Sequence, residues 1–367
     1  MRRASLLIPV LALATAPFAC SDDSADSETP TTAGSTDAST TDAGTTEVST
    51  TDASTTDTSS DASTSASPTT SSPTDPGDGD GDGDGDGDGD GDGDGDGDGD
   101  GDGDVAECED FQAEWIFCDD FEADGPLVAQ GRYFEFADDD GDLAVTDGAG
   151  LGGSRGLRAH FEAGEVDAGS IKLGFGRNPN AYMNKGIRDD EDFREIWYRM
   201  YLRNEAGWTG DPAKLSRATS FASADDWSQA MIAHLWGDGQ ERLLVDPVRC
   251  VAGGQVVCQG YNDFVNMAWL GNLSGQTPIF STARSDQWFC VEAHVRLNDP
   301  GMQNGVQEFW IDGQLEARRE GLDFVGDWTE YGINAVFFEH YWNDGSIQDQ
   351  SRDFDNIVVS TAPIGCL

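Results

Sequence analysis

Residues 288–320 restrict the fold class more than any other part of the chain, because their side chains alternate between apolar and polar. The apolar positions of the first run are Phe289, Val291, Ala293, Val295 and Leu297. A period of two is that of a half-buried antiparallel β-strand. The next residues, DPGMQNG, are rich in turn formers, and the second run, VQEFWID, ends on the turn pair Asp312-Gly313. The pattern predicts a β-hairpin in a sandwich or barrel, with a polar face that meets solvent or lines a groove.

Strand-like runs recur along the chain from residue 115 onwards, separated by Gly, Asp, Asn and Pro. They cover residues 115–122, 156–162, 170–176, 195–203, 227–236, 242–246, 263–270, 333–342 and 352–360. Short strands spaced by turn-rich loops are typical of sandwiches and barrels. We therefore expect an all-β fold, an antiparallel β-sandwich of the jelly-roll type.

The start of the chain reads as an export signal. Residues 1–20 contain two arginines, an apolar core and Cys20 after a small residue. This is the pattern of a bacterial signal peptide, and its end resembles that of lipoproteins. We expect export, with Cys20 lipidated as the N-terminus of the mature chain and the protein held at the cell envelope or surface by this membrane anchor.

Residues 21–104 contain mainly Ser, Thr, Asp, Gly and Ala, and residues 77–104 are an unbroken Gly-Asp repeat. This segment has 25 acidic residues and no Lys or Arg, so it has little to bury and repels itself. Calcium-binding β-helices also contain Gly-Asp repeats, but they add apolar residues that build a core, which this repeat lacks. We expect a disordered, solvated linker.

Residues 105–367 are left to fold, a length suited to one large all-β domain. The chain totals are 21 basic and 70 acidic residues; without the two leader arginines and the 25 linker acids, the net charge of this domain is −26. Such an acidic domain is not expected to bind nucleic acid.

Six cysteines follow Cys20, and an even number in an exported chain predicts three disulfides. Cys250 and Cys258 flank a short hairpin-like loop and are expected to pair. For the other four, Cys108 pairs with Cys118, or one of these two pairs with Cys366; the sequence leaves both open.

Several segments together resemble the concanavalin A-like jelly-roll polysaccharide lyases, of the alginate- and glucuronan-lyase type in families 14 and 20. They are EIWYRMYLRNEAGW, AKLSR, WSQAMIAHLWGDGQERLLVDP, WFCVEAHVRLNDPGMQNGVQEFWIDG, INAVFFEHYWNDGS and FDNIVVSTAPIGC. Two segments depart from the family. AKLSR stands where these lyases have Gly-Lys-Leu-Pro-Gly, and FFEHYWND stands where they have a Phe-Phe-Ser-Thr-Phe-Phe-Gly-Gly stretch.

The resemblance implies a groove for a polysaccharide and cleavage of a uronate by β-elimination. That reaction needs a base for the C5 proton, an acid for the leaving oxygen and a group that neutralises the carboxylate. His234, Tyr341 and Lys214 offer these functions. The residues expected to bind substrate are Arg217, Trp236, His294 and His340. Because His340 and Tyr341 are adjacent on a strand, they point to opposite faces and at most one lies in the groove.

Structural roles compete with each of these assignments. A single His on a strand is more often a hydrogen-bonded structural group than a catalyst. Large aromatic residues are common in sandwich cores, so the ten tryptophans form either a core or a platform on which sugars stack. Only convergence of His234, Lys214 or Arg217, and Tyr341 in one cleft would favour chemistry over structure.

A structural cation is also expected. CDDFEADG near the start of the domain and FDNIVVS near its end resemble terminal strands that hold calcium in jelly rolls. Asp120, Glu122 and Asp355 would supply the oxygen ligands that Ca²⁺ prefers.

Two functions follow from these observations. The first is a surface-tethered protein that binds an extracellular polysaccharide and cleaves it by β-elimination. The second is a non-catalytic carbohydrate-binding or adhesion module, or a structural envelope lipoprotein, with the same fold. Motifs for serine hydrolases, zinc proteases and nucleotide binding do not occur.

Overall fold

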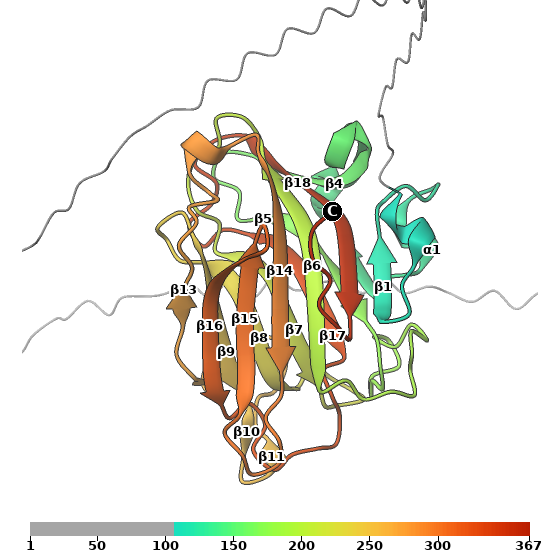
Figure 1. Cartoon of the computed structure of the whole chain (residues 1–367), viewed down its shortest axis with the longest axis vertical. Coiled ribbons are helices and arrows are strands. Elements are labelled where there is room, and N and C mark those ends of the chain that lie inside the picture. Colours follow the sequence, from blue (N-terminus) through green and yellow to red (C-terminus); the bar gives the residue numbers. More distant parts are fainter. Residues whose placement is uncertain (1–105) are drawn as a thin grey trace, which may run out of the picture. The chain divides into compact units, whose positions relative to one another are not determined.

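Two antiparallel sheets lie face to face in the computed structural model, which describes residues 106–367 (Figure 1). The predicted all-β sandwich of the jelly-roll type is confirmed. The predicted signal peptide, the lipidation at Cys20 and the predicted disordered linker lie outside the described residues. Within the described part, no helix has the length and apolar character that a membrane crossing requires.

The first sheet has eight strands, and β14 and β6 lie near its centre. Its order is β16 (Gln314–Leu322), β15 (Gly305–Ile311), β14 (Trp288–Arg296), β6 (Glu195–Asn204), β18 (Gln350–Ser360), β4 (Arg155–Phe161) and β3 (Leu143–Asp147), while β1 (Trp115–Asp119) also pairs with β18.

The second sheet also has eight strands, and it carries the site described below. Its order is β12 (Ala268–Trp269), β9 (Leu243–Arg249), β8 (Gln229–Gly237), β7 (Lys214–Phe221), β17 (Ala335–Tyr341), β5 (Asp167–Gly174) and β2 (Glu135–Ala137), while β13 (Leu273–Ser274) also pairs with β9. The remaining elements are the hairpin β10 (Val251–Ala252) and β11 (Gln255–Val256), the helix α1 (Leu127–Gln130), and the 3₁₀ turns η1 (Glu107–Asp110), η2 (Asp139–Gly141), η3 (Leu151–Gly153) and η4 (Thr282–Arg284).

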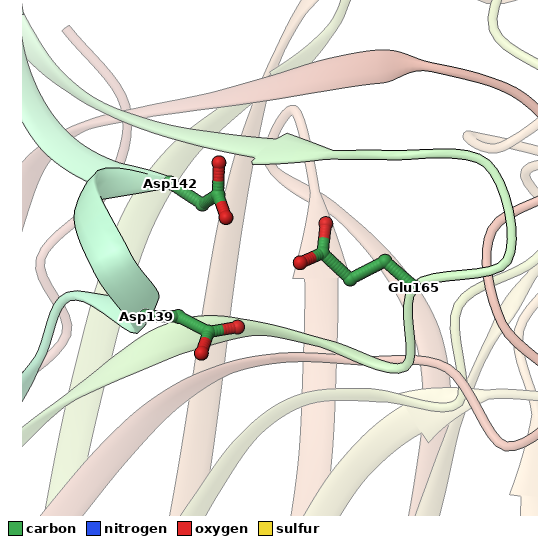
Figure 2. Close-up of side chains that lie close together, drawn as sticks. All are labelled: Asp139, Asp142 and Glu165. Carbon is green, nitrogen blue, oxygen red and sulfur yellow. The ribbon is translucent and has the colours of Figure 1, made fainter.

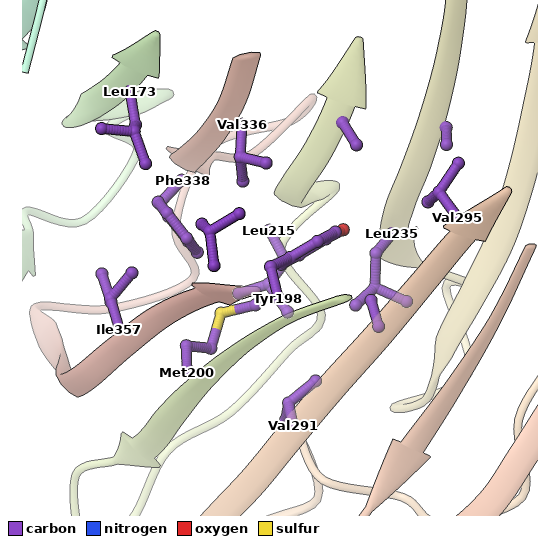
Figure 3. Close-up of a cluster of buried hydrophobic side chains, with 14 of the residues drawn as sticks. Leu173, Tyr198, Met200, Leu215, Leu235, Val291, Val295, Val336, Phe338 and Ile357 are labelled. Atoms are coloured by element: carbon purple, nitrogen blue, oxygen red, sulfur yellow. The ribbon is translucent and has the colours of Figure 1, made fainter. Parts of the chain in front are cut away.

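The hydrophobic core fills the space between the two sheets (Figure 3). The five apolar residues of β14 and its C-terminal neighbour all lie in this core, as their alternation predicts. Val336 and Phe338 of β17 point into it, whereas Phe337 belongs to a separate apolar cluster on the outer face of the second sheet. Alternation along β17 therefore divides its side chains between the core and that outer face.

The predicted turn after β15 is confirmed. Ile311 pairs with Gln314, so Asp312 and Gly313 form a two-residue hairpin loop. Both have positive φ, 50° and 73°, as the tight hairpin turn that suits Asp-Gly requires.

Two strand expectations need correction. Residues 263–270 were expected as a strand, but only Ala268–Trp269 pair with β9, and residues 264–266 form a turn. The side chain of Asp263 accepts hydrogen bonds from the Gln259 and Asn266 nitrogens, which hold the backbone in a loop. Conversely, β7 lies outside the predicted runs, because its centre, Ser216 to Ser220, contains mostly polar residues.

Three disulfides join the six cysteines of the described region. Cys250–Cys258 is confirmed, and Cys108 pairs with Cys118, one of the two open alternatives. The third, Cys290–Cys366, fixes the C-terminal tail over the outer face of the first sheet. There the Glu292 carboxylate accepts the backbone N–H groups of residues 364 and 365. The polar face of β14 is thus covered in part by the chain's own tail.

Candidate functional site

A cavity of about 370 Å³ opens on the outer face of the second sheet. Strands β2, β5, β7 and β17 supply its floor and one side, and loop residues near 227 and 261 supply the other. The lining residues are Glu135, Asp167, Ser170, Lys172, Lys214, Trp227, Tyr261, Asn262, Glu339 and Tyr341. Two of the three predicted catalytic residues, Lys214 and Tyr341, are among them.

A buried ion pair lies in the floor of this cavity. The Arg217 guanidinium donates two hydrogen bonds to the Glu339 carboxylate, at 2.9 and 2.6 Å, and both residues are almost fully buried. The Tyr261 hydroxyl donates to the same carboxylate and accepts from Arg217 at 2.8 Å. Burial alone would raise the pKa of Glu339, but the Arg217 charge and hydrogen bonds outweigh it and hold the pKa at about 2.

Lys214 and Tyr341 form the accessible part of the site. The Lys214 ammonium lies 3.9 Å from the centre of the Tyr341 ring, a cation–π contact. No carboxylate oxygen of the described residues lies within 4.0 Å of this ammonium, whereas the second lysine of the cavity, Lys172, forms an ion pair with Glu135. Burial lowers the pKa of Lys214, although the Glu339 charge opposes that shift. The cavity therefore presents one cation that is available to a ligand.

His234, the third predicted catalytic residue, lies one strand away and does not line the cavity. Its ring is 1% exposed, with the Trp236 ring centre at 3.8 Å and the Trp269 ring centre at 5.7 Å. Its Nδ1 is 3.1 Å from the backbone carbonyl oxygen of Asp246, which accepts the proton of that nitrogen. Burial lowers the pKa of His234 well below its usual value, so the ring is neutral.

The four predicted substrate-binding residues lie in three different places. Arg217 and Trp236 are on the outer face of the second sheet, although Arg217 is fully buried beneath Tyr261. His294 lies on the outer face of the first sheet, stacked on Trp197 at 4.2 Å and hydrogen-bonded to two carboxylates. His340 is fully buried between the sheets, 4.6 Å from the Phe354 ring centre.

Of the carboxylates expected to hold calcium, Asp120 and Glu122 follow β1 and Asp355 is on its partner strand β18. Among the described residues, these three are not a group whose oxygens all lie within 4.8 Å of one another. Asp120 accepts the Cys108 backbone N–H at 3.1 Å, and Glu122 accepts the Arg155 backbone N–H at 2.8 Å. Asp355 accepts the Leu151 backbone N–H at 2.6 Å. Burial is the main cause that raises the pKa of Asp355 to about 7, and the Glu122 charge adds to the rise.

A different set of three carboxylates lies closer together. Figure 2 shows Asp139 and Asp142 at the turn η2 and Glu165 on the connection between β4 and β5. One oxygen of each lies within 4.8 Å of one oxygen of the others. Partial burial is the first cause that raises the pKa of Asp139, and the Asp167 charge is the second. The turn η2 lies against β5, the strand that begins at Asp167.

Sequence reasoning did not single out Tyr261, Lys172, Asp167 or Glu339 as site residues. Glu339 is two residues before Tyr341, and the alternation that separates His340 from Tyr341 puts Glu339 on the face of Tyr341. This was the one available signal for Glu339. Tyr261 lies in a loop before the predicted strand 263–270 and outside every predicted run, and Lys172 pairs with Phe337 across two strands that are far apart in the sequence.

No protein-family model matches the sequence, and no curated protein matches it. The chain is similar to an endo-β-1,4-glucuronan lyase from the fungus Trichoderma reesei, at 12% identity and a TM-score of 0.43, covering 68% of this chain and 96% of that one. It is similar to the PL-14 alginate lyase of Aplysia kurodai, at 11% identity and a TM-score of 0.45, covering 68% and 100%. It is also similar to the T. cruzi calreticulin globular domain, at 13% identity and a TM-score of 0.39, covering 68% and 88%.

The two lyases are of the type that the sequence resembles. At these identities and TM-scores the similarity does not bear on activity, since proteins of unlike function share it. We therefore base the function on the side chains of the cavity alone.

Proposed function

We propose that this chain binds a uronate-containing extracellular polysaccharide in the cavity of the second sheet and cleaves it by β-elimination. One observation carries the proposal: the Lys214 ammonium has no carboxylate partner among the described residues and packs against Tyr341 in an open cavity. A cation beside a phenol is the minimum that elimination from a uronate requires. Trp227 and Tyr261 line the same cavity and offer apolar ring surface for a sugar.

The two residues would divide the reaction between them. Lys214 neutralises the uronate carboxylate, which stabilises negative charge that develops when the C5 proton leaves. The Tyr341 phenolate takes that proton, the C5–H electron pair forms the C4=C5 double bond, and the C4–O4 bond breaks with its electrons on O4. The Tyr341 hydroxyl then returns the proton to O4, so the enzyme ends the cycle as it began.

A non-catalytic glycan-binding module is the second candidate, and the position of His234 favours it. The ring is covered by Trp236 and Trp269, and the Tyr261 hydroxyl already donates to Glu339. The elimination therefore depends on Tyr341 for both proton transfers. A cavity that only binds needs Lys214 and the aromatic walls but no proton transfer.

Incubation of the full-length protein with alginate, glucuronan and a neutral glucan separates these candidates. Cleavage by β-elimination produces an unsaturated uronate, which absorbs in the ultraviolet, from the acidic polymers and not from the glucan. Retention on an acidic polymer without this absorbance would show binding without cleavage and would support the second candidate. No retention and no absorbance on any uronate-containing glycan would contradict both.

Export and anchoring of the domain are also part of the proposal. Glu107, close to the start of the described region, pairs with Arg199 on the outer face of the first sheet. The chain thus enters the sandwich on the side opposite the cavity. We propose that residues 21–104 tether the domain to a lipid-anchored Cys20. The three disulfides are typical of exported proteins.

The calcium site expected at Asp120, Glu122 and Asp355 is kept as a proposal. Oxygen donors suit Ca²⁺, and a cation would offset the cost of ionising the buried Asp355 carboxylate beside Glu122. We expect 1 mM CaCl₂ at pH 8 to raise the melting temperature by about 5 °C relative to EGTA. Asp355→Asn should abolish the shift, and Asp142→Asn, in the other acidic group, should leave it intact. Equal melting temperatures with calcium and with EGTA would contradict the site.

A further inference from the structure

Four residues on four adjacent strands of the second sheet form one row across the site. Trp236 on β8 pairs with Lys214 on β7, Lys214 pairs with Tyr341 on β17, and Tyr341 pairs with Asp167 on β5. Directly paired residues on neighbouring strands present their side chains to the same face. Neighbouring strands lie about 4.8 Å apart, close to the length of one sugar residue in a linear glycan. A glycan that lies across the strands would therefore meet these positions in order.

Only the middle of the row offers a charge that attracts a carboxylate. Lys172 forms an ion pair with Glu135, and Arg217 forms one with Glu339. Among the lining residues that the structure describes, Lys214 is the cation without such a partner. The row therefore has one position for one uronate, at Lys214 and Tyr341.

The β5 end of the row is acidic. Asp167 is exposed and forms no ion pair among the described residues; its carboxylate accepts only the nearby Gly169 backbone N–H, at 3.1 Å. The turn η2, which starts at Asp139, lies against β5, and Asp139, Asp142 and Glu165 form the acidic group drawn in Figure 2. A second uronate placed one sugar further along would meet like charge there, which costs affinity at short distances.

The β8 end of the row is aromatic. Trp236 is partly exposed and Trp269 is 43% exposed; their ring centres are 6.4 Å apart, and both rings contact His234. The Trp236 Nε1 is buried, so the Trp236 ring meets a ligand through its apolar surface. Asp246, the strand partner of His234, adds negative charge. Exposed ring surface beside negative charge suits a neutral sugar rather than a uronate.

We propose that the substrate is a heteropolysaccharide in which single uronates are separated by neutral sugars, and that the site discriminates against continuous polyuronates. This inference rests on the proposed function, because it takes Lys214 as the position of the uronate. It adds that Asp167 on one side and Trp236 on the other each reject a neighbouring carboxylate. Specificity of this kind comes from placing repulsion against the wrong ligand.

Binding of two matched oligosaccharide series tests the inference. One series comes from alginate, in which every sugar is a uronate; the other comes from deacylated gellan, in which isolated glucuronates lie between neutral sugars. Affinities are measured calorimetrically with the full-length protein at one low ionic strength and with EGTA, so that neither salt nor a divalent cation screens the acidic end. We expect the gellan series to bind at least about tenfold more tightly than the alginate series.

Asp167→Asn should remove most of this preference by strengthening alginate binding about tenfold, with little change for gellan. Asp147→Asn is the matched control, because it removes one exposed carboxylate from the other sheet and should change neither affinity. Alginate that binds the native protein as tightly as gellan, or a preference that Asp167→Asn leaves unchanged, would overturn the inference while the proposed function stands. Failure of both series to bind would overturn the proposed function and the inference with it.

Discussion

Replacing Tyr341 with Phe is expected to lower the rate of unsaturated uronate formation by about 10²–10⁴-fold, because the hydroxyl serves as both base and acid. Glycan affinity should change little. The ring that packs against Lys214 remains, and the Tyr341 hydroxyl forms no hydrogen bond within the described structure. The measurement is the absorbance of product against time at saturating polymer, together with calorimetric binding of the same polymer.

Tyr182→Phe is the matched control for this substitution. Tyr182 is 54% exposed and contacts the aromatic cluster of Phe134 without lining the cavity. It should retain the native rate. A Tyr341→Phe variant that is as active as the native protein would exclude Tyr341 as the proton-transfer group, and equal losses in both variants would point to a general effect of losing a phenol.

The alternation in residues 288–320 predicted strands with one face in the core, because a period of two fixes which side chains face the core whatever the partner strands are. The same rule placed His340 and Tyr341 on opposite faces, and the structure has one in the interior and the other in the cavity. The sequence of a single strand is enough to predict which of its side chains share a face of the sheet.

Contacts between strands, and between strands and loops, could not be predicted from the sequence in this way. Alternation puts His234 and Trp236 on the outer face of β8, but Trp269, which covers part of that face, belongs to a loop and a two-residue strand that the sequence presents as a longer run. Likewise, 122 positions separate Arg217 from Glu339, and only the order of β7 and β17 in the sheet brings them together. Arg217, which the sequence predicted to bind substrate, instead forms a buried ion pair with Glu339.

The buried Arg217–Glu339 ion pair is expected to matter strongly for stability. Arg217→Met is expected to lower the free energy of unfolding by about 3–5 kcal/mol, because it leaves the Glu339 carboxylate buried without its charge partner. Adding Glu339→Gln should recover most of the loss, since the double variant has no uncompensated buried charge and Gln still accepts the Tyr261 hydroxyl. Arg188→Met is the control: its partner Glu191 is 44% exposed, so the loss should stay below about 1 kcal/mol. Denaturant unfolding at pH 7 measures all three.

The pH dependence of the same variants separates charge from packing. The pKa of Glu339 is held at about 2 in the folded protein and is near 4.5 when exposed, so its contribution to stability is complete above about pH 4.5 and is lost as the pH falls towards 2. In Arg217→Met the lone carboxylate takes up a proton more readily, and the folded variant then carries no buried charge. The difference between native protein and Arg217→Met should therefore be smaller at pH 3 than at pH 7. A difference that is equal at both pH values would mean that Arg217 stabilises the floor of the cavity through its contacts with Tyr261 and Phe337 rather than through its charge.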